Sequence, residues 1–576
     1  MSKRRWLLAP PAPVSFIARF PEFPPLVAQI FYNRGVHTLA HAQQFVNGID
    51  ESDPVQLGQD PFQLRGMNQA VERIRRAIRD GEAIAVYGDF DADGVCATAL
   101  LTQALKTLGA KAMPYIPHRI NEGYGLNEEA LKELKDKGVR VVVTVDCGIR
   151  SLNEVEAGTT LGLDMIVTDH HSVGKHLPNA ISVINPKQVG EEYPFQEFAG
   201  VGIAFKVAQA LARKQIDEPL PNASALDLDE LLDLVALGTV ADLVPLLGEN
   251  RTLVKRGLAR LNKTDRPGLV ALLQQAGARN RTIDAGTIGY FLGPRLNAAG
   301  RIEHARTAYT LLSTYYPGEA DALASQLETI NRERQKLTDE MVMRAREMVA
   351  LLPPGEFLLI AGSPDFPEGI IGLIASKLQE DAYRPAIAMS HREGVMRGSA
   401  RSIPEFNIVA ALDECSDLLV RHGGHAAAAG FTVKSDNFSA LHTRLRDIAA
   451  RDLAQLELTP TISVDAEADL TEMNWNLLQH LERLAPFGYG NREPVFLSRN
   501  VIVRAARVVG TDHLSLVLSD GIVVWDAIAF RHKDMFPLLN PPPKQVDIVY
   551  TLTSKVWGGE PRLQLEIKDL RLSDGG

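Results

Sequence analysis

Short apolar runs alternate with amphipathic stretches through the first half of the chain. The runs AIAVYG (83–88), RVVVTVD (140–146) and MIVTDHH (165–171) are separated by helical stretches such as NEEALKELKDKG (127–138). Apolar runs of this length, spaced by amphipathic helices, are typical of the buried strands of a parallel sheet. We therefore predict an α/β domain with a parallel sheet over residues 81–315.

Helical patterns flank this domain on both sides. Residues 1–80 are predicted to form an N-terminal helical extension that closes with the amphipathic segment MNQAVERIRRAIRDG (67–81), whose Gly81 is a stop signal. A long charged run over residues 316–354 repeats apolar positions at helical spacing and ends at a pair of prolines. We predict that this run is a helix connecting two domains.

The last part of the chain contains two further patterns. Strand and helix signals start again at EFLLIAG (356–362) and predict a second, smaller α/β domain over residues 355–455. Over residues 456–576 the apolar runs become short and closely spaced, as in TISVDAE (461–467) and IVVWDAIAF (522–530). Such spacing is typical of a small β-barrel, and we predict an OB-like fold.

The composition indicates a cellular compartment but does not identify the class of substrate. The three cysteines, Cys96, Cys147 and Cys415, fit neither a disulfide framework nor a zinc ribbon, so we expect a reducing cytoplasm. The basic start MSKRRWLLAPPAPVSF is interrupted by prolines, and we expect neither a signal peptide nor a membrane anchor. The formal charge of −10 argues against a broadly basic surface for nucleic acid. Metal-binding acids and an arginine-lined channel would reconcile this charge with DNA binding.

Three acids directly follow the first predicted strand. Asp89, Asp91 and Asp93 lie between the run AIAVYG and Gly94, which opens a helix of small residues. In an extended segment, alternate side chains point the same way, and converging acids require a neutralising cation. Carboxylate oxygens suit magnesium or manganese. An EF-hand is excluded because its twelfth position would be Leu100. A solvated loop that caps the next helix is the alternative interpretation.

The next two predicted strands also end in potential ligands. One ends on Asp146, and the other on Asp169, His170 and His171. Because the carboxyl ends of parallel strands lie along one edge, we expect these side chains to approach the three acids above. Neighbouring residues on a strand point to opposite sides, so we expect different roles for the two histidines if the strand extends that far, with hydrogen-bonded packing as the alternative. Asp242, in the helical segment LVALGTVADLVPL, must be paired or metal-bound if it is buried.

Several of these segments resemble a known family. The motifs GDFDADG, VDCG, TDHH and GTVADLVP, in this order, resemble the signature motifs of the DHH phosphoesterases. The segments IPHRINEGYGLN, FAGVGIAFK, GPRLNAAGRI, GSARS and RHGGHAAAAGF are similar to the bacterial branch of that family that degrades single-stranded DNA. This resemblance implies a DHH domain and a DHH-associated domain around a channel, two divalent ions, Mn²⁺ or Mg²⁺, at its base, and a trailing OB fold.

The resemblance also implies roles for individual residues. The implied metal ligands are Asp89, Asp91, Asp93, Asp146, His170 and Asp242. The implied catalytic residues are His171, beside the scissile phosphate, with Asp91, Asp93 and His170, while Asp169 orients its neighbours. The implied contacts to DNA or phosphate are Arg119, Arg295, Asn297, Arg301, Ser399, Arg401 and His425. Phe487 and Tyr489 are candidates for stacking on bases, whereas core packing is favoured for Trp525.

The function implied by the resemblance is a 5′-to-3′ exonuclease that hydrolyses phosphodiester bonds of single-stranded DNA by a two-metal mechanism, in DNA repair and recombination. A phosphodiesterase for short oligonucleotides or cyclic dinucleotides is one alternative. A non-catalytic nucleic-acid-binding module is another. The resemblance implies a single-strand-binding protein and a helicase as partners, and we expect a monomer.

Overall fold

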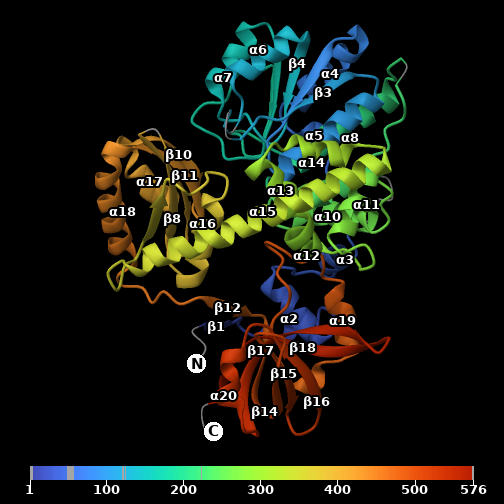
Figure 1. Ribbon diagram of the computed structural model, residues 1–576. Coiled ribbons are helices and arrows are strands. Elements are labelled where there is room, and N and C mark those ends of the chain that lie inside the picture. The colour runs from blue at the N-terminus through green and yellow to red at the C-terminus, as the bar shows by residue number, and fades with distance from the viewer. Residues whose placement is uncertain are drawn as a thin grey trace. The chain divides into compact units, whose positions relative to one another are not determined.

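The apolar runs of the first half form a parallel sheet (Figure 1). The computed structural model describes residues 4–48, 57–119, 122–123, 125–221, 223–392 and 394–573. The strand order is β3 (Lys111–Tyr115), β2 (Ala83–Tyr87), β4 (Val139–Thr144), β5 (Asp164–Thr168) and β6 (Ser182–Ile184). Each neighbouring pair is parallel, which confirms the α/β prediction.

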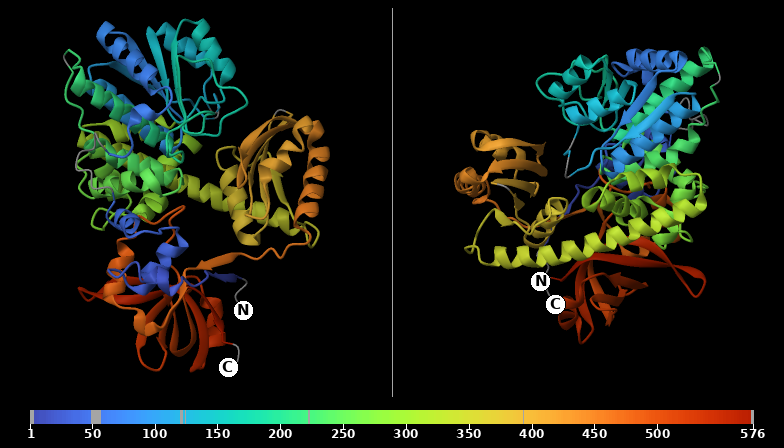
Figure 2. Two further views of the ribbon diagram at one scale, coloured as in Figure 1. Left: turned by 180° about the vertical axis from the view of Figure 1, so that it is seen from behind. Right: turned by 45° about the horizontal axis from the view of Figure 1, so that its top comes forward.

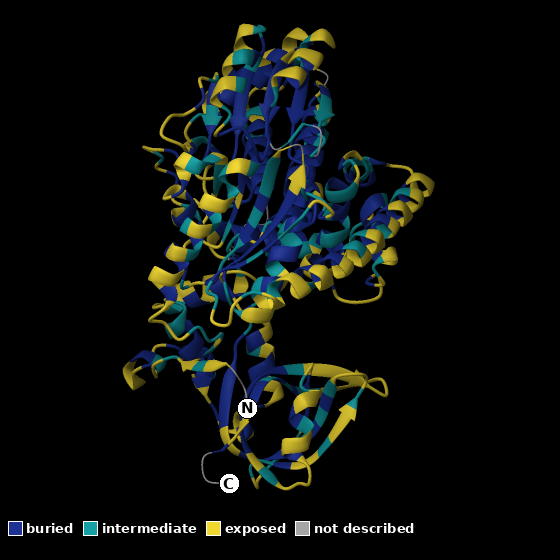
Figure 3. Ribbon diagram, turned by 60° about the vertical axis from the view of Figure 1, so that its left-hand side comes forward, coloured by how far each residue is buried: buried dark blue, intermediate teal, exposed yellow. Residues whose placement is uncertain are grey.

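Helices cover both faces of this sheet. Ile84 and Val86 of β2 share a core with helices on one face, and Ala85 and Tyr87 share a core with helices on the other. The first layer contains α4 (Met67–Asp80), α5 (Ala92–Thr107) and α8 (Gly200–Asp217), and the second contains α6 (Glu128–Asp136) and α7 (Leu152–Thr160). Strands buried on both sides explain the continuous apolar runs, and Figure 3 shows this buried centre.

A block of helices follows the sheet and leads into one long helix. The block contains α9 (Leu232–Ala241), α10 (Gly248–Leu261), α11 (Pro267–Gln275), α12 (Ala285–Thr287), a π-helical turn (Ile288–Leu292), α13 (Gly293–Ile302) and α14 (Arg306–Ser313). Helix α15 (Pro317–Ala350) then runs from this block to a second sheet, as Figure 2 shows. The predicted connecting helix is confirmed.

The second sheet is mixed. Its strand order is β10 (Leu419–His425), β11 (Ala428–Lys434), β9 (Val395–Arg401), β8 (Ala386–Arg392) and β7 (Leu359–Ser363). Only β7 and β8 form a parallel pair among these described strands. One face packs against α15 and α16 (Ile371–Ala382), and the other against α17 (Ile408–Asp413) and α18 (Phe438–Leu453). This is the predicted smaller α/β domain.

The last strands close into a barrel. They are β14 (Phe496–Val509), β15 (His513–Ser519), β16 (Val524–Ala529), β18 (Glu560–Leu572) and β17 (Lys544–Trp557), and β17 pairs back to β14. The short strand β13 (Ala466–Glu467) and the helix α19 (Trp475–Glu482) precede them. The predicted OB-like barrel is confirmed.

The N-terminal residues pack with the barrel. Strand β1 (Arg5–Leu8) pairs in parallel with β12 (Thr461–Val464), and Phe20 and Phe31 belong to the hydrophobic core of the barrel. Residues 1–50, 459–487 and 491–576 form one compact unit, and residues 51–458 and 488–490 form another. The limits set from sequence at residues 80, 315, 354 and 455 stay predictions. Among the described residues, no helix has both the length and the apolar character that a membrane span requires.

Candidate metal centre and phosphate pocket

The acids after β2 occupy a tight turn into helix α5. The strand ends at Tyr87, and Asp91 is the N-cap residue of α5, where its carboxylate accepts hydrogen bonds from the N–H groups of Asp93 (2.9 Å) and Gly94 (3.0 Å). A Cβ on Gly94 would lie 2.7 Å from the backbone nitrogen of Asp89, so only glycine fits this turn. The expectation that an extended strand aligns the three acids was wrong. The turn brings them together instead, because the first helical residue is already Ala92.

Asp93 caps a second helix. Its Oδ2 accepts a hydrogen bond from the N–H of Gly200 (2.6 Å), and its Oδ1 accepts one from the N–H of Val201 (3.0 Å), both in the first turn of α8. The helix N-terminus therefore stabilises the ionised carboxylate. Burial, followed by the charge of Asp91, nevertheless raises the pKa of Asp93 to about 7. Asp93 thus connects the GDFDADG motif to the FAGVGIAFK segment.

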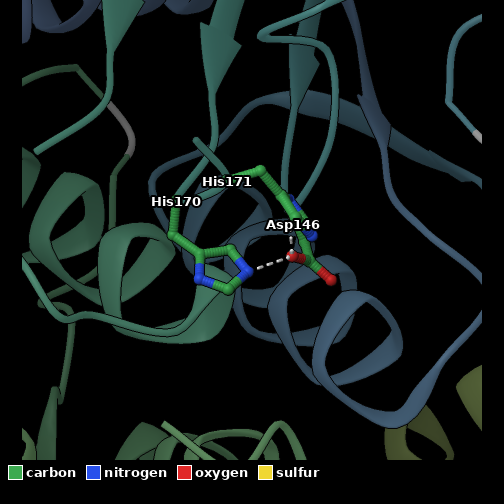
Figure 4. A group of neighbouring side chains, drawn as sticks. All are labelled: Asp146, His170 and His171. Atoms are coloured by element: carbon green, nitrogen blue, oxygen red, sulfur yellow. Dashed lines mark ion pairs between the residues drawn. The ribbon is translucent and has the colours of Figure 1, made fainter. Parts of the chain in front are cut away.

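Asp146 and His170 meet beside these acids. The Oδ1 of Asp146 lies 3.0 Å from His170 Nε2, and the Oδ2 of Asp242 lies 3.7 Å from the same nitrogen. Figure 4 shows the His170 ring directed at the Asp146 carboxylate. Asp146 has a φ of 62°, an uncommon backbone conformation for a residue other than glycine. Strain of this kind is tolerated where function requires it.

Burial sets the protonation of this group. It raises the pKa values of Asp89, Asp146 and Asp242 well above the usual range, and the neighbouring acids raise them further. It lowers the pKa of His170 to about 3, so this imidazole is neutral. Burying like charges this closely is unfavourable unless a cation or protons neutralise them.

The donor set fits divalent metal ions. Three overlapping groups bring their ligand atoms within 4.8 Å of one another: Asp89, Asp91 and Asp146; Asp93, His170 and Asp242; and Asp146, His170 and His171. Asp89 Oδ1 and Asp242 Oδ2 are buried and accept no hydrogen bond from the residues that the structure describes. Buried carboxylate oxygens that accept no hydrogen bond, together with one neutral imidazole nitrogen, are suitable ligands for Mn²⁺ or Mg²⁺. The structure therefore brings together all six predicted ligands.

Asp169 holds His171 rather than joining this group. Its Oδ1 accepts hydrogen bonds from the backbone N–H of His171 (3.0 Å) and from its Nδ1 (2.7 Å), and its Oδ2 accepts one from the N–H of Ile149 (2.9 Å). Strand β5 ends at Thr168 and does not extend to the two histidines, so the alternation expected along a longer strand does not apply to them. Their environments still differ, because the side chain of His170 is 8% exposed and that of His171 is 45% exposed.

A cavity of about 430 Å³ opens onto the acids. It is lined by Asp89, Phe90, Asp91, Ala92, Asp93, Arg119, Ala241, Asp242, Asn297 and Arg301. The guanidinium of Arg119 lies over the ring of Phe90, 4.8 Å from its centroid, and Asn297 Oδ1 accepts a hydrogen bond from the N–H of Ala92 (2.8 Å). Ile120, Asn121 and Tyr124 of the motif around Arg119 lie outside the described residues.

Burial and neighbouring arginines lower the pKa values of two arginines near this cavity. Burial, followed by the charges of Arg119, Arg334 and Arg401, lowers the pKa of Arg301 to about 9. Burial and Arg119 likewise lower the pKa of Arg401. Clustered cations are unfavourable without an anion between them, so the pocket favours a phosphate.

Ser399 and Arg401 lie together on β9. Arg401 donates a hydrogen bond from Nη1 to Ser399 Oγ (3.1 Å). A Cβ on Gly372, in the first turn of α16, would lie 2.9 Å from Arg401 Nη2 and 3.2 Å from Ser399 Oγ. His425 ends β10, and burial followed by the charges of Arg401 and His171 lowers its pKa.

Arg295 is placed differently from the other predicted phosphate contacts. Its Nε lies 2.8 Å from Glu328 Oε2 on α15, and its Nη1 donates to the carbonyl of Phe291 (2.7 Å). Like Ser399, Arg401 and His425, it does not line the cavity, but it differs from them in its ion pair with an acid. Its contact with phosphate stays a prediction.

Known proteins share this organisation. The chain matches family models for the DHH family N-terminal domain (residues 83–239), the DHHA1 domain (355–451) and the RecJ OB domain (464–569). It is 37% identical, over all of its length and 71% of the relative, to the single-stranded-DNA-specific exonuclease RecJ of Bacillus subtilis (strain 168). The chain belongs to the RecJ family.

Solved structures of this family have the same fold. RecJ from Thermus thermophilus, in complex with Mn²⁺, superposes with a TM-score of 0.83 at 29% identity, covering 100% of this chain and 80% of that one. Its complex with Mg²⁺ superposes with a TM-score of 0.78 at 28% identity, covering 100% and 79%. Both metals that the sequence predicted thus occur in a RecJ protein of the same fold.

The sequence alone did not indicate a role for two residues at or near this pocket. Phe90, which lies under Arg119, is an apolar residue inside an acidic motif, and no pattern assigns it a role. Arg334, on α15, lies close enough to Arg301 for its charge to lower the pKa of Arg301, and its sequence context of many charged residues does not single it out. Of the aromatic candidates, Tyr489 is 65% exposed, whereas Phe487 and Trp525 pack against the barrel core.

Proposed function

We propose that this protein is an exonuclease that hydrolyses phosphodiester bonds of single-stranded DNA from the 5′ end with two divalent ions, Mn²⁺ or Mg²⁺. The observation that carries the proposal is the buried group of acids and one neutral histidine, which faces a cavity lined by Arg119 and Arg301. Membership of the RecJ family supports single-stranded DNA as the substrate.

The ligand groups suggest how two ions would be held. Asp89, Asp91 and Asp146 would bind one ion, and Asp93, His170 and Asp242 the other. Two ions bound there would supply a hydroxide nucleophile at neutral pH and neutralise charge that develops on the phosphate.

The chain's own residues would orient the phosphate and hold a proton at a defined atom. Arg119, Arg301 and Arg401 would hold phosphate oxygens, since each guanidinium presents a planar set of donors. Burial acts to raise the pKa of Asp169, but the hydrogen bonds and charge of His171 lower it to about 2. Asp169 is therefore ionised and can only accept, so His171 carries its proton on Nδ1. His171 would then present Nε2 to the substrate.

We further propose the cellular setting implied by the family. The protein would act in DNA repair and recombination, as a cytoplasmic monomer beside a single-strand-binding protein and a helicase. Three buried cysteines without disulfides support a reducing compartment. The domain limits at residues 80, 315, 354 and 455 are part of the same proposal.

The test uses variants that keep the fold. Asp91→Asn retains a side chain that caps helices as well as aspartate does, so loss of activity would report the missing charge rather than the missing cap. His170→Ala removes the neutral ligand, and Asp136→Ala, at an exposed position of α6, is the control. Strands labelled at either end, blunt duplex and dinucleotides are digested with Mn²⁺ or Mg²⁺.

We expect the wild type and the control to degrade single strands from the 5′ end and to stop at duplex. Asp91→Asn and His170→Ala should lose this activity while their melting temperatures stay close to that of the wild type. Equal attack from both ends would refute the polarity. Cleavage of dinucleotides alone would favour a phosphodiesterase for short substrates.

A further inference from the structure

Strand β6 ends at the same edge of the sheet as the strands that carry the metal ligands. It pairs in parallel with β5, with Ile184 opposite Thr168, and the carbonyl of Ile184 accepts a hydrogen bond from the N–H of Asp169 (3.1 Å). The carboxyl ends of parallel strands lie side by side, and ligands bind beyond them. The residues that directly follow Ile184 can therefore reach the same substrate.

A β-turn follows β6 and is anchored to the catalytic edge. The N–H of Gln188 donates to the carbonyl of Asn185 (3.1 Å), and asparagine followed by proline, here Pro186, is typical of the start of such a turn. The side chain of Asn185 is fully buried. Its Nδ2 donates to the carbonyl of His171 (2.9 Å), and its Oδ1 accepts from the N–H of Lys187 (2.8 Å). Lys187 thus occupies a defined place beside His171.

The charge of Lys187 acts on the metal centre. Burial is the main cause of the lowered pKa of His170, and Lys187 contributes to it. At Asp242, where burial raises the pKa well above its usual range, the charge of Lys187 acts in the opposite direction. Burial is also the main cause of the lowered pKa of His425, to which Lys187 again contributes. The ammonium is therefore close to two metal ligands and to the end of β10.

Lys187 and Arg119 act on different parts of this centre. Burial, followed by the charge of Asp91, raises the pKa of Asp89, and the charge of Arg119 opposes that rise. Asp89 and Asp242 belong to different groups of potential ligands. Lys187 is partly buried, and within the described ranges its ammonium has neither an ion pair within 4.0 Å nor a hydrogen bond. Its three donors are thus available to a ligand with negative charge.

We propose that Lys187 binds the phosphate that lies over the metal ligands, from the side of Asp242, while Arg119 binds it from the side of Asp89. This role rests on the proposed function, which brings a phosphodiester to the buried acids. A cation beside the acids offsets their repulsion of the entering phosphate. It also stabilises charge that develops on the phosphate oxygens during displacement. Because the contact is made at the reacting phosphate, short and long substrates both require it.

The test separates contact with the substrate from an effect on the metal. Lys187→Met removes the charge and keeps an unbranched side chain, and Lys187→Arg restores the charge. Lys132→Met, at an exposed position of α6, removes the same charge elsewhere and is the matched control. With Mn²⁺, kcat and KM are measured for each full-length variant on a labelled single strand and on a dinucleotide.

Two further measurements do not depend on cleavage. The rise in melting temperature that Mn²⁺ causes reports the metal site. Binding of a fluorescent oligothymidylate without divalent ions, over a range of salt concentrations, reports the contact with phosphate.

Lys187→Met should lower kcat on both substrates by roughly 100-fold to 1,000-fold, the range that removal of one donor to developing charge gives. Lys187→Arg should recover most of this loss. The slope of log K against log salt should fall by about 0.7 in Lys187→Met, the contribution of one phosphate contact on a single strand. The effect of Mn²⁺ on the melting temperature should not become smaller, since no ligand is lost. Lys132→Met should match the wild type throughout.

Three results would overturn the role of Lys187. Wild-type kcat in Lys187→Met would show that the contact is not used, and loss on the long strand alone would place it at a different phosphate. A smaller effect of Mn²⁺ on the melting temperature would show that Lys187 acts through the metal site. If the wild type cuts neither substrate, the proposed function fails, and the salt dependence of binding alone decides whether Lys187 contacts phosphate.

Discussion

Asp169 accepts two hydrogen bonds from His171, one from the backbone N–H at 3.0 Å and one from Nδ1 at 2.7 Å. The second contact fixes which ring nitrogen carries the proton, since an ionised carboxylate cannot donate. Burial acts to lower the pKa of His171, but the hydrogen bond with Asp169 raises it overall. One acid thus sets both the orientation and the protonation of the exposed histidine.

Asp169→Asn should lower kcat by about 10-fold to 100-fold, the effect that loss of such a supporting residue typically has. The amide can donate to Nδ1, which favours the ring with its proton on Nε2. Single-turnover kinetics measure the change, and the KM for single-stranded DNA should stay nearly constant. An unaltered kcat would show that the protonation of His171 does not matter for the reaction.

Gly200→Ala should displace the side chains of both Asp93 and Asp146. The new Cβ would lie 2.5 Å from the Cβ of Asp146, and the N–H of residue 200 donates to Asp93. We expect a loss of about 1–3 kcal/mol in the free energy of unfolding, the usual cost of overpacking, together with loss of activity. Gly318→Ala in α15, where no atom lies within 4 Å of the added Cβ, is the control and should change neither. Urea denaturation distinguishes the two variants.

Divalent ions should stabilise the folded protein because they neutralise the buried acids. An ion at 100 times its Kd adds about 2.7 kcal/mol to the free energy of unfolding. Differential scanning fluorimetry should therefore show a higher melting temperature with Mn²⁺ than with KCl at the same ionic strength. Asp242→Asn should reduce this shift, since its Oδ2 is a buried acceptor without a donor among the described residues. An equal shift in the variant would remove Asp242 from the ligand set.

Arg295 and Arg301 should respond oppositely to truncation. Arg295 is mostly buried against Glu328, so Arg295→Ala should lower stability, by at most about 3 kcal/mol, and leave the affinity for DNA nearly unchanged. Arg301→Ala should weaken binding of the strand, because Arg301 lines the cavity. Thermal unfolding and anisotropy titrations, run on both variants, check the assignment. If Arg295→Ala bound DNA more weakly while its stability was unchanged, this result would support the predicted contact between Arg295 and phosphate.

The sequence could predict the strands because burial on both faces leaves continuous apolar runs. It could also predict that Asp89, Asp146 and His170 meet, since strand ends share an edge in any parallel sheet. It could not predict that a turn, rather than an extended segment, arranges the first acids. The turn forms because Asp91 is the N-cap of α5. Aspartate is common both as an N-cap and as a metal ligand, so its presence in the sequence does not distinguish the two roles.

The sequence also could not predict contacts between residues that are far apart along the chain. Nothing in the local pattern indicates that Asp93 caps α8, that Arg295 pairs with Glu328, or that Phe20 packs in the core of the barrel. Each contact depends on how distant elements pack. Propensity and periodicity describe single elements and carry little information on such pairings.

The ligands come from separate strand ends and helix ends between residues 89 and 242. A nascent chain that has not yet emerged past Asp242 therefore lacks part of the metal site, and so does any fragment that ends before it. The order of synthesis itself delays the appearance of a DNA-cutting centre until the supporting helices exist. Truncated products that end before Asp242 should therefore lack metal-dependent nuclease activity.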